Sequence, residues 1–218
     1  MKINRSFRSP NFDPQPIIVE FVVIHYTACN LQSTFDIFRQ AEKKASSHLI
    51  VSNTGEVYEA VDCWEDKVLR AWHSGKSRYK EAENEWQNFN DFSIGIELVN
   101  LNGNIFNYSE KQYESLSKII THLKKRHKAL KSPSRIIGHE QISAWRGKID
   151  PGWMFDWKRL FTLCYPGIEA PERKPALPEE LREIMQKFID CSPQEEMAKA
   201  KFWQTLNETL ETAKRVGS

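Results

Sequence analysis

Cysteine is scarce in this chain, and its spacing excludes the folds that depend on it. Only 4 of the 218 residues are cysteines, and no two of them form a CxxC or CxxH pair. This pattern excludes a small disulfide-stapled secreted scaffold and a cysteine-rich zinc finger. We expect the reduced thiols of a cytosolic protein, with a pairing between two of them left open, at Cys29, Cys63, Cys164 and Cys191.

Long apolar runs are also missing. The longest, residues 16–26, is interrupted by Glu20 and is too short to span a bilayer. The first residues carry charge, but no apolar run follows them, so they do not resemble a secretory signal. We therefore expect no transmembrane segment and a cytoplasmic location, or a periplasmic or cell-envelope location if an upstream segment has been removed.

Neither sign of charge is in excess. The chain has 31 lysines and arginines against 29 aspartates and glutamates, which gives a net charge of +2. So weak a balance gives no electrostatic reason to expect nucleic acid or an anionic membrane as the defining partner. Aromatic residues, in contrast, are frequent: 7 Trp, 12 Phe and 6 Tyr supply enough apolar surface for a core. The length fits one sizeable domain, or one domain with a small addition.

Strand and helix patterns alternate along the first part of the chain. Runs rich in β-branched residues, and one Ser-Asn-Thr-Gly turn between two such runs, indicate strands and a hairpin. Helical spacing of apolar residues indicates two helices, the second opened by a capping box of Ser109 and Gln112. The order predicts an α/β sheet with helices packed on it. The expected strands are residues 17–26, 47–51, 56–61, 92–99 and 135–138, and the expected helices are residues 31–44 and 110–129.

The composition changes near residue 166, where prolines cluster. Four prolines between residues 166 and 178 predict an extended linker. Beyond the linker, stretches rich in Glu, Lys, Leu and Ala predict two helices over residues 179–190 and 193–215, the second capped by Ser192. We therefore divide the chain into a domain over residues 1–166, a Pro-rich linker over 167–178 and a helical C-terminal extension over 179–218.

The extension carries an apolar stripe that requires burial. We expect it to pack against its own domain, and docking on a partner or binding of glycan are the alternatives. The stripe consists of Leu181, Ile184, Phe188, Met197, Phe202, Leu206 and Leu210.

Histidines and carboxylates lie at or near the ends of the expected strands. His25 ends one strand and His139 follows another, with Asp150 eleven residues further on. Two histidines and one carboxylate suit zinc and leave a fourth position open for water, whose activation also requires a base. Glu97, inside an apolar strand, is a candidate base, and Lys148 is a candidate cation for an oxyanion. Each residue taken singly also fits a structural role, and no HExxH-type spacing joins them.

The order of short motifs along the chain relates these candidate residues to one another, which their spacing does not. The chain contains VIHYTA (23–28), SSHLIV (46–51), AWHSG (71–75), NDFSIGIE (90–97), GHE (138–140), KIDPG (148–152) and FDW (155–157). Over roughly residues 8–163 this series resembles the zinc-dependent N-acetylmuramoyl-L-alanine amidases of the amidase-2 group. That group shares a fold with the peptidoglycan recognition proteins and phage T7 lysozyme, so the resemblance implies a mixed central β-sheet flanked by helices.

The resemblance also implies a set of functional residues. It makes residues 1–166 a zinc amidase domain in which His25, His139 and Asp150 bind one Zn²⁺. Glu97 would activate water, and Lys148 would stabilise the oxyanion. The implied reaction cleaves the amide between the lactyl group of N-acetylmuramic acid and the L-alanine of the stem peptide, in wall degradation or recycling. Intact peptidoglycan and soluble anhydro-muropeptides both remain open as substrates, and a non-catalytic binding protein is the alternative.

Other residues of these motifs have less defined roles. Trp72, His73 and Arg78 are candidates for the substrate groove, although a structural role is equally open for His73. His48 is expected to form a structural hydrogen bond under the sheet. Cys29, four residues after His25, is expected to be a plain thiol, and a thiolate ligand is the alternative. Residues 81–90 contain no arginine to bind a stem-peptide carboxylate, so the stem preference stays open.

Overall fold

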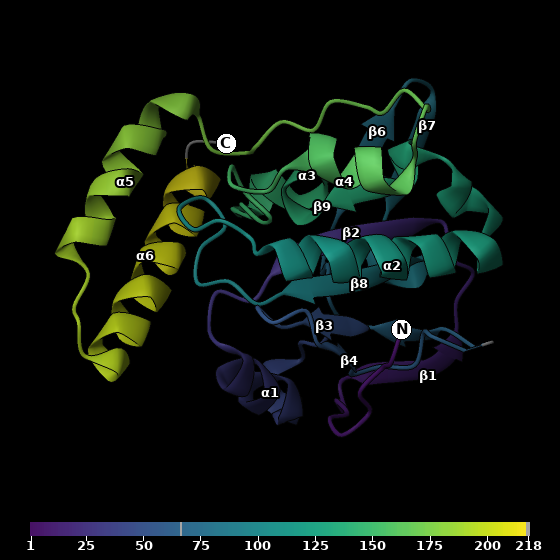
Figure 1. Ribbon diagram of the computed structural model, residues 1–218, viewed down its shortest axis with the longest axis horizontal. Helices are drawn as coiled ribbons and strands as arrows, with labels where there is room; N and C mark the ends of the chain where they lie inside the picture. Colours follow the sequence, from purple (N-terminus) through teal and green to yellow (C-terminus); the bar gives the residue numbers. More distant parts are fainter. Residues whose placement is uncertain (66, 217–218) are drawn as a thin grey trace.

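A mixed five-stranded sheet lies at the centre of the computed structural model, which describes residues 1–65 and 67–216 (Figure 1). The strand order is β4-β3-β8-β2-β9, in which β3, β8, β2 and β9 are parallel and β4 pairs antiparallel with β3. The mixed sheet and the β3–β4 hairpin confirm the sequence prediction. The five strands are β2 (Phe21–Tyr26), β3 (Leu49–Val51), β4 (Val57–Glu59), β8 (Ser93–Leu98) and β9 (Ile136–Gly138).

The first predicted strand is shorter than expected. The sequence predicted residues 17–26, whereas β2 begins at Phe21 and a separate strand β1 (Phe12–Pro16) precedes it. β1 is not part of the central sheet. It pairs antiparallel with β5 (Leu69–Ala71) in a separate two-stranded sheet, with an irregular register between Asp13 and Pro16. Proline cannot donate a ladder hydrogen bond, and it is therefore confined to strand edges and irregularities. Ile18, which the prediction placed in the strand, is 84% exposed.

Helices cover both faces of the sheet. α2 (Glu110–Arg126) begins with the predicted capping box of Ser109 and Gln112, and it packs with α4 (Trp157–Cys164) on the face formed by alternate residues such as Ile24 and Ile96. α1 (Leu31–Arg39), capped by the Asn30 side chain, packs on Ile50 from the other face. Figure 1 shows α2 running across one face with α1 below the sheet. The predicted helices 31–44 and 110–129 both continue into 3₁₀ turns rather than α-helix.

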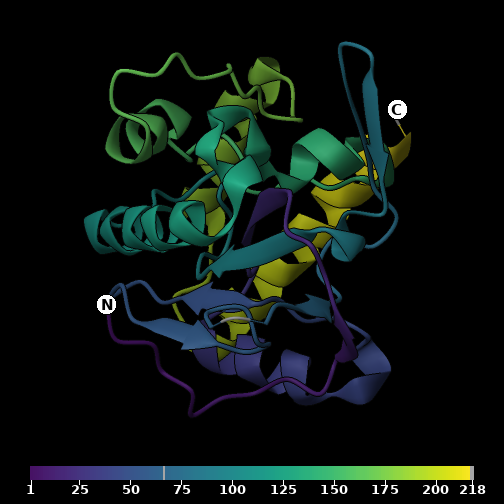
Figure 2. The same cartoon turned by 90° about the vertical axis from the view of Figure 1, so that its right-hand side faces the viewer.

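The remaining elements are short and lie around the sheet. A β6–β7 hairpin projects from the body of the molecule (Figure 2). The short elements are β6 (Arg78–Glu81), β7 (Asn84–Gln87), α3 (His139–Ser143) and the 3₁₀ turns η1 (Ala41–Lys43), η2 (Phe89–Asp91), η3 (Lys128–Lys131), η4 (Pro133–Arg135), η5 (Ala144–Arg146) and η6 (Glu179–Leu181).

The C-terminal extension forms two helices, α5 (Arg182–Cys191) and α6 (Glu196–Val216), at one end of the sheet (Figure 1). Trp203 of α6 is completely buried, in a cluster with Ile105 and Ile149 of the main domain. The structure therefore has the extension packed on its own domain, as expected. Two members of the predicted stripe face outward instead: Ile184 is 51% exposed and Met197 is 80% exposed.

The start of α6 differs from the prediction. The sequence favoured Ser192 as the cap, but the helix begins at Glu196. The Glu195 carboxylate accepts hydrogen bonds from the amides of Met197 (3.0 Å) and Ala198 (2.6 Å), so Glu195 satisfies the first free N–H groups of the helix. Ser192 is thus a turn residue between the two helices, and its prediction as a cap is wrong.

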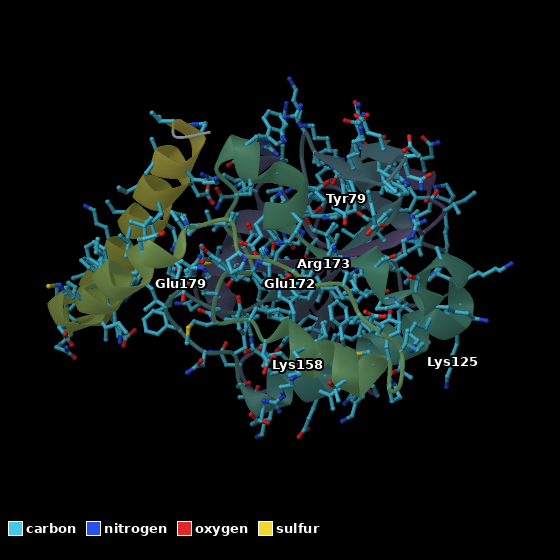
Figure 3. All side chains as sticks on the ribbon, turned by 90° about the horizontal axis from the view of Figure 1, so that it is seen from above. Tyr79, Lys125, Lys158, Glu172, Arg173 and Glu179 are labelled. Carbon is cyan, nitrogen blue, oxygen red and sulfur yellow. The ribbon has the colours of Figure 1, made fainter. Side chains whose placement is uncertain are left out.

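The Pro-rich segment is attached to the domain by a buried arginine. Arg173 is 8% exposed, and its guanidinium donates to the Tyr79 hydroxyl (3.1 Å) and to the carbonyls of Ser134 (2.7 Å) and Ile136 (3.2 Å). Figure 3 shows Arg173 and Tyr79 close together. These bonds hold the segment in place between α4 and α5. The division of the chain at residues 166 and 178 stays a prediction.

The structure bears on two expectations: the state of the cysteines and the presence of membrane-spanning helices. All four cysteines are free thiols, so no disulfide pairs them. Within residues 1–65 and 67–216, we find no helix with the length and apolar character that crossing a membrane requires.

Replacing Trp203 with alanine should lower the free energy of unfolding by about 3–5 kcal/mol, the usual cost of truncating a buried tryptophan. The indole N–H finds no acceptor among the described residues, so the loss comes from packing. Urea denaturation measures the change. Met197→Ala, at an exposed position of the same helix, should stay within about 0.5 kcal/mol of the parent. Equal effects of the two substitutions would show that α6 is not packed through Trp203.

Candidate active site

The parallel strands bring the predicted residues to one edge of the sheet. His25 of β2 is the register partner of Glu97 of β8. Ile24 of β2 pairs with Gly138, the last residue of β9, so that His139 follows next to His25. Side chains alternate between the two faces of a strand, and Ile24 and Ile96 face α2, so His25 and Glu97 share the opposite face. The carboxyl ends of parallel strands are a common position for ligand sites.

His25, His139 and Asp150 form a compact cluster at this edge. The two Nδ1 atoms lie 3.1 Å apart, and Asp150 Oδ2 is 2.9 Å from His25 Nδ1 and 3.1 Å from His139 Nδ1. All three residues are buried, with 2%, 5% and 6% exposure. The Glu140 amide donates to the Asp150 carbonyl (2.8 Å), which ties the loop carrying Asp150 to the start of α3. The structure thus brings together the three residues predicted as metal ligands.

The donor set fits a divalent metal ion. Zinc ligand atoms lie ~2.0–2.2 Å from the ion, which puts tetrahedral ligand atoms roughly 3.3 Å from one another. The three edges of the observed triangle are close to that value. Two imidazole nitrogens and one carboxylate oxygen form a set that zinc favours, and three protein ligands leave a position open.

The far side of each ligand histidine is also held. His139 Nε2 lies 3.2 Å from the Ser74 carbonyl, to which it donates. His25 Nε2 lies 3.1 Å from His73 Nδ1, and His73 Nε2 in turn faces the Ser93 carbonyl at 3.4 Å. With protons on the Nε2 atoms, His25 and His139 both present a free lone pair at Nδ1 to the cluster. His73, predicted in the groove, therefore also supports His25 from behind.

Gly95 makes room for this arrangement. A Cβ at position 95 would lie 2.4 Å from the His73 ring, which is closer than any side chain tolerates. The glycine of the SIGIE motif is therefore required sterically, because β8 passes directly over the ring that contacts His25.

Burial and neighbouring charges set the protonation of the cluster. Burial and the adjacent His139 lower the pKa of His25 to about 4, which keeps its imidazole neutral at physiological pH. Burial alone would raise the pKa of Asp150, but the charge and hydrogen bonds of His139 and His25 hold it well below its usual range. Neutral imidazole and ionised carboxylate are the forms that bind metal ions.

Glu97 differs from Asp150 in that one of its carboxylate oxygens lacks a hydrogen-bond partner among the described residues. Its Oε2 atom is buried and meets no donor within residues 1–65 and 67–216. Burial, together with the charge of Asp150, raises the pKa of Glu97 to about 8, although Lys148 acts in the opposite direction. A bound divalent cation would favour the ionised form. An unpaired carboxylate oxygen near a site that can bind a metal ion is suited to taking a proton from water.

One cleft of about 760 Å³ is lined by all the predicted site residues except Arg78, including Glu97 and Lys148. Lys148 Nζ forms an ion pair there with Glu211 of α6, at 3.1 Å and 3.0 Å from the two carboxylate oxygens. A second cleft of about 770 Å³ lies beneath the Pro-rich segment and is lined by none of the predicted site residues. The two clefts are nearly equal in size, so the chemistry of the lining residues, and not the volume, identifies the candidate active site.

The other predicted residues are divided between the cleft and its surroundings. Trp72 lines the cleft, and its indole N–H donates to Asp13 (3.1 Å). Arg78 lies on β6 over the Trp145 ring, 5.2 Å from its centroid, and is not part of the cleft lining. His48 donates from Nε2 to the Leu69 carbonyl (2.7 Å) and accepts from the Gly95 amide (3.0 Å), a structural role as expected.

The structure also shows the surroundings of Cys29, whose role the sequence left open, and of Glu211, which the sequence did not indicate. Cys29 Sγ bonds to the Thr27 carbonyl and the Thr34 hydroxyl, and it is not part of the metal-binding cluster. Glu211 lines the cleft although sequence reasoning did not single it out. It is one of three glutamates of α6, stands 61 positions after Asp150, and is marked by no motif.

Known proteins resemble this chain in both sequence and structure. The family described as N-acetylmuramoyl-L-alanine amidase matches residues 13–153. The 1,6-anhydro-N-acetylmuramyl-L-alanine amidase AmpD of Haemophilus influenzae is 33% identical over 178 residues, covering 72% of this chain and 90% of AmpD. A crystal structure of a selenomethionine AmpD derivative has a TM-score of 0.58 at 29% identity, over 75% of this chain and 99% of its own.

Two similar structures contain ligands. AmpDH3 of Pseudomonas aeruginosa in complex with anhydromuramic pentapeptide has a TM-score of 0.56 at 28% identity, over 72% of this chain and 64% of its own. AmiD of E. coli in complex with its substrate anhydro-N-acetylmuramic acid-L-Ala-D-γ-Glu-L-Lys has a TM-score of 0.56 at 25% identity, over 73% and 60%.

A mixed α/β fold with a buried His-His-Asp cluster in an open cleft fits the metal-dependent hydrolases, whose open metal site activates water. The family match covers more than half of the chain. The chain belongs to the amidase-2 family of N-acetylmuramoyl-L-alanine amidases, enzymes that hydrolyse the amide bond between N-acetylmuramic acid and the L-alanine of the stem peptide. This confirms the family that the order of motifs predicted.

Proposed function

We propose that the amidase reaction of this chain uses one zinc ion held by His25 Nδ1, His139 Nδ1 and Asp150 Oδ2. The single observation that carries the proposal is the buried triangle of these atoms, with edges of 2.9–3.1 Å. When bound, zinc supplies Lewis acidity, which activates water at neutral pH and polarises a carbonyl group. His73 keeps His25 in the metal-binding tautomer through the contact at Nε2.

Glu97 is the proposed base. Its unpaired Oε2 accepts a proton from water as the water oxygen attacks the lactyl carbonyl carbon. The same proton then passes to the alanine nitrogen as the carbon–nitrogen bond breaks, because an amine leaves poorly without it. The products are the lactyl carboxylic acid and a stem peptide with a free amino terminus.

Lys148 is the proposed cation for the oxyanion that develops on the lactyl oxygen. It lines the cleft with Glu97 and stands two residues before Asp150. Trp72, in the wall of the cleft, offers an aromatic face to the sugar. Arg78 stays a prediction as a contact for the stem peptide.

Soluble anhydro-muropeptides are the proposed substrates. The support comes from the relatives: one is named a 1,6-anhydro-N-acetylmuramyl-L-alanine amidase, and two similar structures hold anhydromuramic peptides. The predicted cytoplasmic location agrees with a soluble substrate and with four free thiols. Fractionation of cells with an antibody against the protein tests the location, and recovery of the protein with the envelope would contradict it.

Purified protein should release L-alanine-initiated peptides from anhydro-muropeptides at least about 10-fold faster than from isolated sacculi of equal muropeptide content. We expect this ratio because a cleft of about 760 Å³ admits a single muropeptide readily. Mass spectrometry of the products measures both rates. Equal or faster release from sacculi would contradict the proposed substrate. Binding of muropeptide without cleavage by zinc-loaded protein would instead favour a binding protein.

A further inference from the structure

The C-terminal extension reaches into the active-site cleft. Glu211 of α6 lines the cleft together with Lys148, and its two carboxylate oxygens lie 3.1 Å and 3.0 Å from Lys148 Nζ. Both side chains are partly shielded, with 27% exposure for Lys148 and 35% for Glu211. The catalytic cation proposed above therefore has its counter-ion on a segment that lies outside the family match over residues 13–153.

α6 is fixed rather than loosely attached at this position. Asn207, one turn before Glu211, accepts a hydrogen bond from the Tyr26 hydroxyl (2.9 Å) and donates to the Leu101 carbonyl (2.8 Å). Tyr26 follows His25 directly, so this bond links α6 to the strand that carries a metal ligand. The buried Trp203 holds the helix one turn further back. These contacts are those of a permanent wall of the cleft rather than of a moving lid.

The loop carrying Lys148 also packs against the α6 backbone. Gly147 has φ +91°, and a Cβ there would lie 2.1 Å from the Glu211 carbonyl oxygen. A glycine is therefore required both by the backbone conformation and by the close approach. The loop and the helix meet through main chain at Gly147 and through side chains at Lys148.

We propose that Glu211 is a positioning residue for the amidase reaction, whose carboxylate holds the Lys148 ammonium where the oxyanion develops. The inference rests on the role of Lys148 proposed above. A lysine ammonium has three N–H donors on a flexible stem. With two of them directed at the Glu211 oxygens, the third is left for the substrate, and the stem is ordered before the substrate arrives. Preorganised donors need no rearrangement during the reaction.

Glu211→Ala should therefore lower kcat roughly 10-fold and leave KM within about twofold, because the contact acts in the transition state rather than in binding. Glu211→Gln, which keeps the shape and one acceptor, should show a smaller loss. Glu208→Ala, at an exposed position one turn earlier, is the matched control and should retain the parent kcat. An unchanged or raised kcat in both Glu211 variants would overturn the inference. Melting temperatures show whether each variant folds. If Glu211→Ala does not fold, the kcat of Glu211→Gln tests the inference instead.

A double substitution separates positioning from general damage. In a Lys148→Met background, Glu211→Ala should have no further effect on kcat beyond about twofold, because its effect passes through Lys148. A full 10-fold loss in that background would overturn the inference. Lys148→Met alone tests the proposed function: if it retains the parent kcat, the role of Lys148 is wrong. If Lys148→Met has a reduced kcat while Glu211→Ala does not, the role of Lys148 stands and only the inference about Glu211 is wrong.

Chemical labelling provides a readout that does not depend on turnover. Acetic anhydride should acetylate Lys148 faster in Glu211→Gln than in the parent, as measured by peptide mass spectrometry, because the neutral amide no longer holds the Lys148 nitrogen in an ion pair and leaves it more accessible to the reagent. Glu208→Ala should label Lys148 at the parent rate. Equal labelling in all three zinc-loaded proteins would overturn the ion pair on which the inference depends.

Discussion

His139→Ala is expected to lose both zinc and turnover. The substitution removes one of three ligand atoms and opens the buried triangle around Asp150 Oδ2. Lewis acidity is worth several kcal/mol to such a reaction, and each 1.36 kcal/mol is a factor of ten, so kcat/KM should fall by roughly 10³-fold or more. Zinc content, measured by elemental analysis, should drop from about one per chain to nearly none.

His122→Ala is the matched control for this prediction. His122 lies on α2, stacked on Trp64 with ring centroids 3.9 Å apart, and it is not part of the metal-binding cluster. The control should keep zinc and activity. If His139→Ala kept full zinc content and activity, the triangle would not be the metal site, and other donors in the cleft would have to be sought.

Glu97→Gln is expected to keep zinc but lose turnover. The amide keeps the shape of the side chain, yet it cannot accept and return the proton that the reaction moves. Loss of a positioned general base costs 10²–10⁴-fold, so we expect kcat to fall by about 10³-fold. Zinc content should stay at about one per chain, because Glu97 is not among the three proposed ligands. Glu114→Gln, at an exposed position on α2, should behave as the parent.

The same variant has a distinct effect on stability in the metal-free protein. Burial raises the pKa of Glu97 to about 8, whereas an unfolded glutamate titrates near ~4.3. Between these values the unfolded chain has lost the proton that the folded chain keeps, so the free energy of unfolding falls as the pH rises through this window. Glutamine has no proton to lose. Metal-free Glu97→Gln should therefore gain stability over the parent from pH 5 to pH 8, and little near pH 4, in urea denaturation with a chelator.

A constant stability difference over this range would contradict the raised pKa of Glu97. Full activity in Glu97→Gln would contradict its role as the base. The two readouts are independent, since one is made without metal and the other with it.

Much of the site followed from the chain itself. β-branched runs placed His25 at the end of a strand and Glu97 inside another, and the motif order supplied the association of both with His139 and Asp150. The structure then gathered the three predicted ligands within 3.1 Å. The capping box at Ser109 and the hairpin around residue 53 were also correct, because such local patterns involve neighbours in sequence. The cap at Ser192 failed because the helix begins later, at Glu196, where the Glu195 carboxylate accepts from the first free amides.

The sequence by itself determined the family, the residues of the His-His-Asp cluster and the mixed sheet, since these depend on local periodicity and on ordered motifs. Only the tertiary structure decided that His25 and Glu97 are register partners, that His73 supports His25 from behind, and that α6 brings Glu211 to Lys148. The physical reason is the distance along the chain. A contact across 48 or 63 residues depends on how strands pair and helices pack, and no local pattern records it. The C-terminal helices, which in sequence are only an apolar stripe, are in the fold a wall of the active site.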